Sequence, residues 1–464
     1  MKESATNRAH AANALNHVIY HNRTIDWVIQ NQSDEMSTPL VSELVYGVCR
    51  YYFSLSQLLD ARLKKPLRDK DSILYCLLLV GAYQLLRTDI KSHAVVNETV
   101  NACGLVKRPW ARGMVNGVLR NIQRASPEHA NSPDTEQSFE LPAWLHDMLK
   151  IDYGADFAEL ATANLQRAPM TLRINQRNTD RETYLASLTS NDISYATHEL
   201  PYAVTLNQPM ATARLPGWST GQVAVQDYGA QLVGALATRL LSNSDTPQHV
   251  LDACCAPGGK LFHLLEHTTT SQVASMVALE VSESRAQSTE AIAQRLGHKL
   301  PIVRGDAGAL DWWDERPFSF ILLDAPCSGT GTLRRHPDIK LLLTPEQVTE
   351  HARKQLQLLE NLWSTLAVGG TLLYCTCSLL AVENDNVIER FLADTHQADK
   401  GSRDEFKSTA EVLDVNSLMP FSTGRATQFG WQLLPTDINT DGFYMALLKK
   451  VSTPAMPRSS STAS

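Results

Sequence analysis

Between residues 226 and 450, short apolar segments alternate with longer amphipathic ones, and this alternation constrains the fold more than any other feature of the chain. Five segments have the length and apolar content of buried strands: HVLDA, MVALE, FSFILLDA, TLLYCTCS and FYMALLKK. Stretches between them, such as RAQSTEAIAQRL, have the spacing of amphipathic helices. Strand–helix alternation predicts an open parallel sheet with helices on both faces over residues 226–450.

The rest of the chain predicts other folds. At 464 residues it is long enough for two to four domains of roughly 100–200 residues each. Residues 1–126 have apolar positions at helical spacing and predict a bundle of five to seven helices. Residues 127–140 are polar and predict a linker, residues 141–225 predict a small α+β region, and residues 451–464 predict a disordered tail.

Charge is distributed unevenly along the chain. Residues 1–126 hold 16 Lys and Arg against 10 Asp and Glu, while the remainder holds 26 against 39. A basic N-terminal region in a protein of net charge −7 is compatible with a polyanionic partner, and also with chance. The segment RPWARGMVNGVLRNIQR combines arginines with an amphipathic pattern, so it is either a solvated basic surface helix or a helix that faces RNA.

Composition excludes several classes of protein. Hydrophobic residues make up 43% and charged residues 20%, which is typical of globular proteins and not of disordered or collagenous chains. We find no apolar stretch long enough for a transmembrane helix, and the N-terminal sequence lacks the apolar core of a signal peptide. We therefore expect a cytoplasmic protein that does not bind membranes, with eight cysteines present as thiols.

The first motif with chemical content is HVLDACCAPGGK at residues 249–260. It predicts a buried strand, a glycine-rich turn and then a helix, and ligands of open α/β sheets bind at such turns. Gly258 and Gly259 permit unusual backbone dihedral angles and close approach. The spacing matches neither a P-loop nor GxGxxG, so the motif alone does not identify the ligand.

Acidic residues follow successive predicted strands. They are Asp252, Glu280, Asp306 and Asp324. Any one of them could simply be a turn former or a helix cap. Because the carboxyl ends of parallel strands meet at one edge of the sheet, we expect all four at that edge, where a carboxylate such as Glu280 can accept ribose hydroxyls.

Two cysteines are predicted at the same edge. Cys327 lies in the loop DAPCSGTGTLRRHPD, and Cys377 ends the strand of LLYCTCSLLAVEND. Two thiols beside a ligand-binding turn indicate covalent catalysis. Cys49, Cys76, Cys103 and Cys375 have the pattern of buried core residues. Zinc is not expected, because the closely spaced cysteines are adjacent (Cys254–Cys255) or form CxC (Cys375–Cys377), and CxxC pairs are missing from the sequence.

The segments DACCAPGGK, DAPCSGTGTLRRHPD and YCTCSLLAVEND together resemble motifs of the RNA cytosine-5 methyltransferases. The helical N-terminal region resembles the NusB-type RNA-binding fold, and this combination is similar to the Fmu/Sun (RsmB) family. The resemblance covers nearly the whole chain. It implies a NusB-like all-α bundle, a small α+β region and a Rossmann-like methyltransferase domain that uses S-adenosylmethionine. It further implies 16S ribosomal RNA as partner and methylation of cytosine 967. Nothing in the sequence demands more than a monomer.

The resemblance also implies residue roles. Cys377 would be the nucleophile that adds to C6 of cytosine, and Cys327 would help release the product. Asp324 would orient the base, and Lys260 would polarise the base or hold Asp324. The cofactor would be bound by Glu280, Asp306, Asp324 and the loop Cys254, Cys255, Ala256, Pro257, Gly258, Gly259 and Lys260. RNA would be bound by Arg108, Arg112, Arg120 and Arg124.

Two other interpretations remain open at this point. The same chemistry could act on tRNA or on another ribosomal RNA site. Alternatively, the chain could be a non-catalytic RNA-binding or antitermination factor with an inactive cofactor fold, although the presence of Cys327, Cys377, Asp324 and Lys260 argues against that.

Overall fold

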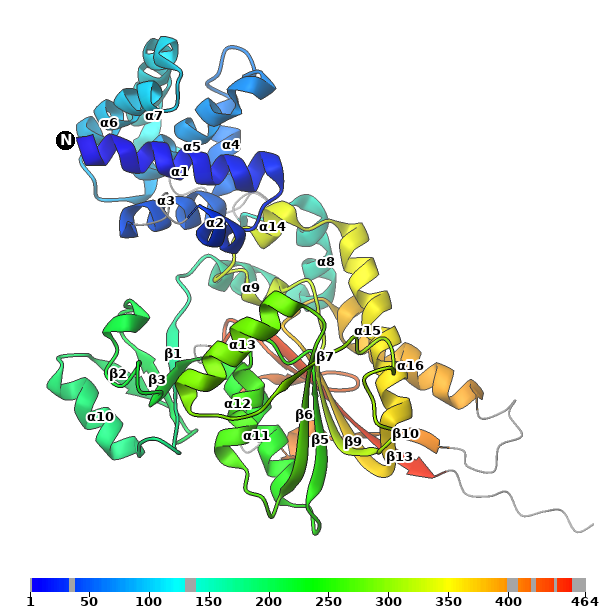
Figure 1. Ribbon diagram of the computed structural model, residues 1–464. Coiled ribbons are helices and arrows are strands. Elements are labelled where there is room, and N and C mark those ends of the chain that lie inside the picture. Colours follow the sequence, from blue (N-terminus) through cyan, green and yellow to red (C-terminus); the bar gives the residue numbers. More distant parts are fainter. Residues whose placement is uncertain are drawn as a thin grey trace, which may run out of the picture. The chain divides into compact units, whose positions relative to one another are not determined.

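The computed structural model describes residues 2–32, 38–129, 139–398, 408–418, 423–437 and 440–452. The chain divides into two compact units (Figure 1). The helical unit comprises residues 1–167 and 332–345, and the sheet unit comprises residues 168–331 and 346–464. Most of the predicted linker and most of the predicted tail lie outside the described residues.

The helical unit contains the predicted bundle. Its α-helices are α1 (Lys2–His21), α2 (Ile25–Asn31), α3 (Pro39–Arg50), α4 (Tyr52–Asp60), α5 (Ser72–Arg87), α6 (Ser92–Leu105), α7 (Arg112–His129), α8 (Ala143–Tyr153), α9 (Phe157–Asn164) and α14 (Ile339–Leu342). Short 3₁₀ turns are η1 (Asp69–Asp71), η2 (Pro109–Ala111) and η4 (Gly154–Asp156). Helices α1 to α7 confirm the expectation of five to seven helices in the N-terminal region.

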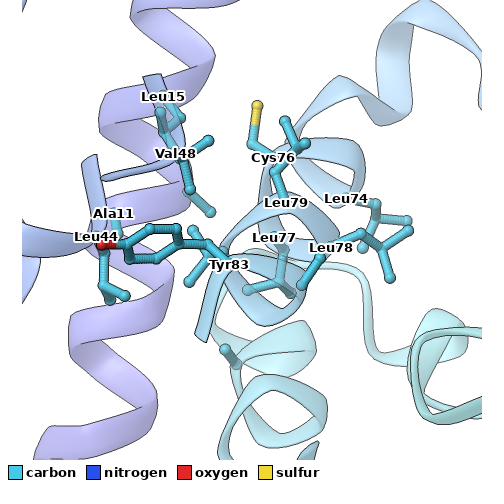
Figure 2. Close-up of a cluster of buried hydrophobic side chains, with 14 of the residues drawn as sticks. Ala11, Leu15, Leu44, Val48, Leu74, Cys76, Leu77, Leu78, Leu79 and Tyr83 are labelled. Carbon is cyan, nitrogen blue, oxygen red and sulfur yellow. The ribbon is translucent and has the colours of Figure 1, made fainter. Parts of the chain in front are cut away.

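Helix α5 is the centre of this bundle. Its sequence SILYCLLLVGAYQLLR is apolar on nearly all sides, and such a helix is stable only when neighbours surround it. Helices α1, α3, α6 and α7 pack around it. Figure 2 shows the Tyr83 ring of α5 reaching toward Ala11 of α1 and Leu44 of α3, while Leu74 and Leu78 lie on the other side of α5. Cys49, Cys76 and Cys103 are buried in this core, as the sequence predicted.

A segment remote in sequence completes the helical unit. Residues 332–345 follow the DAPCSG loop of the sheet unit and contain the short helix α14. Leu341 and Leu342 pack against the bundle core. The buried Asp338 accepts a hydrogen bond from the amide of Ile25 at 2.9 Å, and the buried Lys340 ammonium donates to the carbonyl of Arg50 at 2.6 Å.

The sheet unit begins with a small antiparallel sheet. Its strands are β1 (Met170–Ile174), β2 (Tyr195–Thr197), β3 (Ala203–Leu206) and β4 (Val223–Val225), in the order β2-β3-β1-β4. Helix α10 (Arg181–Ser190) connects β1 to β2, and η5 (Thr212–Arg214) lies between β3 and β4. Asp180 caps α10, because its carboxylate accepts from the amide of Thr183 at 2.7 Å. These elements form the later part of the small α+β region that the sequence predicts over residues 141–225, whereas its first two helices, α8 and α9, belong to the helical unit.

A larger sheet follows. Its strands are β5 (Gln248–Ala253), β6 (Val273–Glu280), β7 (Ile302–Arg304), β8 (Phe318–Asp324), β9 (Leu366–Thr376), β10 (Ser408–Leu413), β11 (Arg425–Ala426), β12 (Trp431–Leu433) and β13 (Phe443–Ser452). Its order is β11-β12-β13-β9-β8-β5-β6-β7, with β10 paired to β13. The helices are α11 (Tyr228–Ser242), α12 (Gly259–His267), α13 (Glu283–Leu296), α15 (Pro345–Thr365), α16 (Asp385–Ala398) and α17 (Val415–Leu418), with the turns η6 (Thr330–Thr332) and η7 (Ala381–Glu383).

Helices cover both faces of this sheet, as Figure 1 shows. Alternate residues of the central strands enter different cores. Val250 and Leu322 pack in the core that contains α11, whereas Leu251 and Leu323 pack in the core that contains α15 and α16. Side chains that are buried on both faces explain why these strands are nearly continuous apolar segments. The Rossmann-like prediction is confirmed.

One strand differs from the prediction. FYMALLKK forms β13, which pairs antiparallel with β9, so the sheet is not parallel throughout. Strand β12 also runs antiparallel to β13, and antiparallel neighbours need only short connections. A buried apolar segment carries the same pattern in either direction, so the sequence did not reveal the orientation.

None of the helices in the described part of the chain is both long enough and apolar enough to cross a membrane.

The Asp338 contact generates the first prediction. Asp338→Ala would leave the Ile25 amide in a buried position without its acceptor, at a cost of about 1–3 kcal/mol to the helical unit. We expect faster amide hydrogen exchange in α2 and a lower unfolding temperature. Asp338→Asn keeps an acceptor oxygen and should lose less. Unchanged exchange in the alanine variant would show that the segment does not support α2.

Candidate active site

The glycine-rich turn between β5 and α12 has the geometry that its sequence requires. Gly258 has φ of +95°, in the left-handed region, and precedes the first residue of α12. A Cβ at this position would lie 2.2 Å from Cε2 of Phe262. Cys254 also has a positive φ, of 61°. The chain therefore leaves β5 through a sharp turn that only glycine can complete at residue 258.

A cavity of about 450 Å³ opens beside this turn. Its walls come from the residues after β5, β6 and β7 and from α13 and α15. The lining includes three residues that the sequence assigned to the cofactor, Cys254, Glu280 and Asp306. Cys255, Ala256, Pro257, Gly258, Gly259, Lys260 and Asp324 do not line it. The structure thus brings part of the predicted cofactor site together around one cavity.

Glu280 ends β6 at the wall of this cavity and is 1% exposed. Its Oε1 accepts from the amide of Ser282 at 2.9 Å and lies 3.6 Å from the Arg285 guanidinium. Its Oε2 is buried and has no hydrogen-bond partner among the described residues. A buried acceptor without a donor is costly, so this oxygen is suited to a ligand that supplies hydroxyl groups.

Asp306 follows β7 and is exposed at the cavity. Its Oδ1 accepts from the amide of Gly308 at 2.8 Å, which fixes the turn after the strand. Its backbone carbonyl accepts from the indole of Trp312 at 3.0 Å. The carboxylate is therefore held at the cavity by its own loop.

The two cysteines predicted to act together do meet. The sulfur atoms of Cys327, after β8, and Cys377, after β9, are 3.3 Å apart. Backbone hydrogen bonds align the two segments: Ala325 donates to the carbonyl of Cys375 at 2.9 Å, and Gly331 donates to that of Cys377 at 2.8 Å. The hydrogen bond with Cys377, burial and nearby negative charge raise the pKa of Cys327, so Cys327 keeps its proton.

Lys260 and Asp324 form an ion pair next to the cysteines. The Lys260 ammonium is buried and lies 2.7 Å from Oδ2 of Asp324, while the thiol of Cys375 lies 3.5 Å from Oδ1. Burial alone would lower the pKa of Lys260, but the Asp324 carboxylate outweighs it and raises that pKa above its ordinary value. Lys260 is therefore a fixed cation, and Cys375 is buried as predicted.

One of the four acidic residues is not at the predicted edge. Asp252 lies inside β5, is 1% exposed, and neither carboxyl oxygen has a hydrogen-bond partner in the described part of the chain. Burial and the charge of Asp324 raise the pKa of Asp252 well above its usual range. The prediction that all four acids face one rim was therefore wrong for Asp252.

Several cavity residues were missed by sequence reasoning. Arg285 of α13 lines the cavity and donates to the carbonyl of Ala256 at 2.7 Å, so it also supports the glycine-rich turn. His351, Arg353 and Lys354 reach the cavity from α15. In the sequence these side chains belong to charged faces of amphipathic helices, and nothing in their spacing separates them from solvated residues.

The arginines predicted to bind RNA lie in the helical unit, away from this chemistry in sequence. Arg112, Arg120 and Arg124 are exposed on α7. Arg108 differs from them, because its Nε donates to Asp71 at 2.8 Å and its guanidinium also donates to the carbonyl of Lys70 at 2.6 Å. Arg108 is thus committed to an internal contact.

A pair of glycine substitutions tests the turn. Gly258→Ala should destabilise the protein by more than about 1 kcal/mol, because the new Cβ meets Phe262 and φ is positive. Gly259→Ala is the matched control, since its Cβ would come no closer than 3.4 Å to any neighbour. Thermal unfolding of both variants checks this, and equal unfolding temperatures would contradict it.

Comparisons with known proteins agree with this geometry. Residues 239–449 match the family described as 16S rRNA methyltransferase RsmB/F, residues 5–124 match the NusB family, and residues 141–213 match the ferredoxin-like domain of RsmF/B-like methyltransferases. The probable ribosomal RNA small subunit methyltransferase B of Coxiella burnetii is 37% identical over 96% of this chain and 99% of that protein. The ribosomal RNA small subunit methyltransferase B of Escherichia coli O157:H7 is 36% identical over 97% and 100%.

Solved structures show the same fold. The protein PH0851 superimposes with a TM-score of 0.77 at 20% identity, covering 96% of this chain and 98% of that one. NSun6 from Pyrococcus horikoshii, crystallised with SFG, superimposes with a TM-score of 0.55 at 18% identity, covering 67% and 99%. The full-length identity to curated relatives, together with the paired cysteines beside the glycine-rich turn, establishes that this chain belongs to the RsmB/F family of 16S rRNA methyltransferases.

Proposed function

We propose that this protein transfers a methyl group from S-adenosylmethionine to C5 of a cytosine in 16S ribosomal RNA, through a covalent adduct between Cys377 and C6. By family resemblance the target is cytosine 967. The observation that carries the proposal is the 3.3 Å separation of the Cys327 and Cys377 sulfurs beside the Lys260–Asp324 pair. The names of the relatives support the RNA class.

The cavity fits the proposed cofactor. The buried Oε2 of Glu280, which has no donor among the described residues, suits the ribose hydroxyls, and Asp306 suits the adenine amino group. A neighbouring fold was crystallised with SFG, an analogue of S-adenosylmethionine, which supports the same ligand. Cys254 and the following loop to Lys260 would border the methionine part. When bound, S-adenosylmethionine supplies a methyl group on a positively charged sulfur.

The two thiols would divide the chemistry between them. C5 of cytosine is a poor nucleophile until a thiolate adds to C6, which places an electron pair on C5. Cys377 would form this bond, and C5 would then take the methyl group. A base removes the C5 proton, the C5–C6 double bond re-forms, and the sulfur–C6 bond breaks. Cys327 keeps its proton and lies next to the other sulfur, so it is placed to serve the release step.

Lys260 and Asp324 would bind the base. Asp324 can accept from the exocyclic amino group of cytosine, and the ammonium of Lys260 at 2.7 Å holds this carboxylate in one position. The target base must leave its stack, because addition at C6 and methylation at C5 require access to the ring. Single-stranded or loop RNA presents such a base at the lowest cost.

One face of α7 would bind RNA in this proposal. Gly113, Gly117, Arg120 and Arg124 recur at the spacing that places residues on one side of a helix, and all four are exposed. A Cβ at Gly113 or Gly117 would meet no atom within 4 Å. Glycine inside a helix costs about 0.5–1 kcal/mol relative to alanine, so packing does not explain these two. An RNA backbone could approach the open helix surface and contact the two arginines.

The test of the chemistry is methyl transfer from tritiated S-adenosylmethionine to unmodified small-subunit rRNA. Cys377→Ala should lower the rate by at least about a thousandfold and form no adduct, because the nucleophile is lost. Cys327→Ala should accumulate a covalent protein–RNA complex on a denaturing gel, because release is impaired.

Cofactor binding serves as the control for both variants and should remain near the wild-type affinity. Near-normal turnover in Cys377→Ala would overturn the nucleophile assignment. If wild-type protein labels tRNA or another rRNA site but not 16S rRNA, the chemistry stands and the substrate changes. If it labels none of these RNAs while cofactor binding is intact, the chain is a non-catalytic RNA-binding factor.

The RNA face has its own prediction. Arg120→Ala and Arg124→Ala should each weaken RNA binding and reduce the slope of log affinity against log salt by about 1. Lys65→Ala, which removes another exposed cation of the helical unit, is the control and should change neither quantity as much. Point substitutions are preferable to deletion of residues 1–126, because residues 332–345 pack on that region. Equal effects of all three variants would leave α7 without a special role.

A further inference from the structure

A single buried carboxylate connects the two segments that carry the cysteines. Ser328 comes directly after Cys327, and Ser378 directly after Cys377. The amide of Ser328 donates to Oε1 of Glu383 at 2.8 Å, and its hydroxyl donates to Oε2 at 2.5 Å. The hydroxyl of Ser378 donates to the same Oε2 at 2.6 Å. Each cysteine is thus one residue away from a hydrogen bond to Glu383.

A side chain from helix α15 reinforces this arrangement. The amide side chain of Gln355, on α15, donates to Oε1 of Glu383 at 3.1 Å and to the carbonyl of Pro326 at 2.9 Å. Cys327 is therefore held through its preceding residue by Gln355 and through its following residue by Glu383. Thr330 adds a contact to the hydroxyl of Ser378 at 3.1 Å.

Burial of the Glu383 carboxylate costs desolvation free energy, which its hydrogen-bond donors must offset. Its side chain is fully buried, and Gln355 next to it is buried as well. A buried carboxylate needs several donors to offset its desolvation, and an apolar side chain of similar volume would fill the space at lower cost. All four of the donors described above come from the cysteine loop, the cysteine strand end or α15, so none comes from the helix α16 that follows Glu383.

We infer that Glu383 is a positioning residue that sets the separation of the Cys327 and Cys377 sulfurs. It acts through Ser328 and Ser378 and does not touch the base. The inference rests on the proposed function only where it predicts an effect on kcat, because two thiols that act on one base must keep a fixed separation. The separation itself is a property of the free protein.

The substitution that tests this is Glu383→Gln. Glutamine keeps the volume and one acceptor oxygen for the amide of Ser328. Its NH₂ group replaces the oxygen that receives two hydroxyl hydrogens, so Ser328 and Ser378 must reorient or move apart. Asp385→Asn is the matched control. Asp385 also accepts several hydrogen bonds, from Thr427, Gln428, Phe429 and Tyr444, but none from a neighbour of either cysteine.

The first readout uses the protein without RNA or cofactor. Diamide accepts two electrons and two protons from two thiols and leaves a disulfide, which peptide mass analysis locates. We expect rapid formation of a Cys327–Cys377 disulfide in the wild type and in Asp385→Asn, and formation slower by about tenfold or more in Glu383→Gln. Thermal unfolding of all three proteins, run in parallel, shows whether slower disulfide formation in Glu383→Gln comes from a general loss of stability. A loss of that kind should also slow disulfide formation in Asp385→Asn.

The second readout is catalysis. Glu383→Gln should lower kcat by roughly tenfold to a hundredfold, the range expected when reacting groups are misplaced by about 1 Å, with RNA and cofactor affinities near wild type. The covalent RNA complex should persist longer than in the wild type. Ser378→Ala removes one of the hydroxyl contacts to Glu383. It should lower the rate of disulfide formation and kcat, each by less than Glu383→Gln does. It replaces Glu383→Gln if that variant does not fold.

The outcomes separate the two proposals. Slower disulfide formation in Glu383→Gln without methyl transfer in the wild type would keep the positioning role and overturn the proposed reaction. Disulfide formation at the wild-type rate in a folded Glu383→Gln or Ser378→Ala protein would overturn the positioning role. A wild type that forms no such disulfide would overturn it as well, because the sulfurs would then not be neighbours.

Discussion

Parallel pairing of β5, β6, β7, β8 and β9 is the constraint on which the site depends. Strands that run in one direction end at one edge of the sheet, so residues from positions 254, 280, 306, 327 and 377 of the chain come to the same edge. The pairing of Asp324 with Cys375 in adjacent strands sets the two cysteine segments side by side. No local sequence preference could produce this arrangement, since each residue is supplied by a different strand.

One partly buried ion pair, between Lys260 and Asp324, organises the electrostatics at this edge. The Asp324 carboxylate accepts a hydrogen bond from the Lys260 ammonium. Asp252 is buried without a hydrogen-bond donor in the described residues, and burial together with the charge of Asp324 raises the pKa of Asp252 well above its usual range. Two carboxylates beside a single ammonium would leave one negative charge uncompensated in a buried region, which is costly. The raised pKa of Asp252 favours its neutral form, and this preserves the one-to-one pair of Lys260 and Asp324.

Much of the fold was predictable because burial on both faces leaves a simple apolar pattern in β5 and β8 and in the C-terminal halves of β6 and β9. The meeting of Cys327 and Cys377 was also predictable, since both follow parallel strands. The antiparallel direction of β13 was not, because an apolar run has no direction. Arg285 and Glu383 were missed for a different reason. Each acts through contacts with residues distant in sequence, Ala256 for one and Ser328 and Ser378 for the other, and charged residues near helix starts are ordinary in sequence.

The location of residues 332–345 in the helical unit has a consequence for how the protein can be divided. The chain passes between the two units three times, after residues 167, 331 and 345. Neither unit is encoded by one contiguous stretch of sequence. A fragment that ends near residue 167 would lack α14, which packs against the core of the helical unit. A fragment that starts there would contain α14 without the helices on which it packs. Recombination that exchanges one unit between relatives would have to move two separate stretches of sequence together. The helical bundle and the segment that follows the cysteine loop are therefore inherited together.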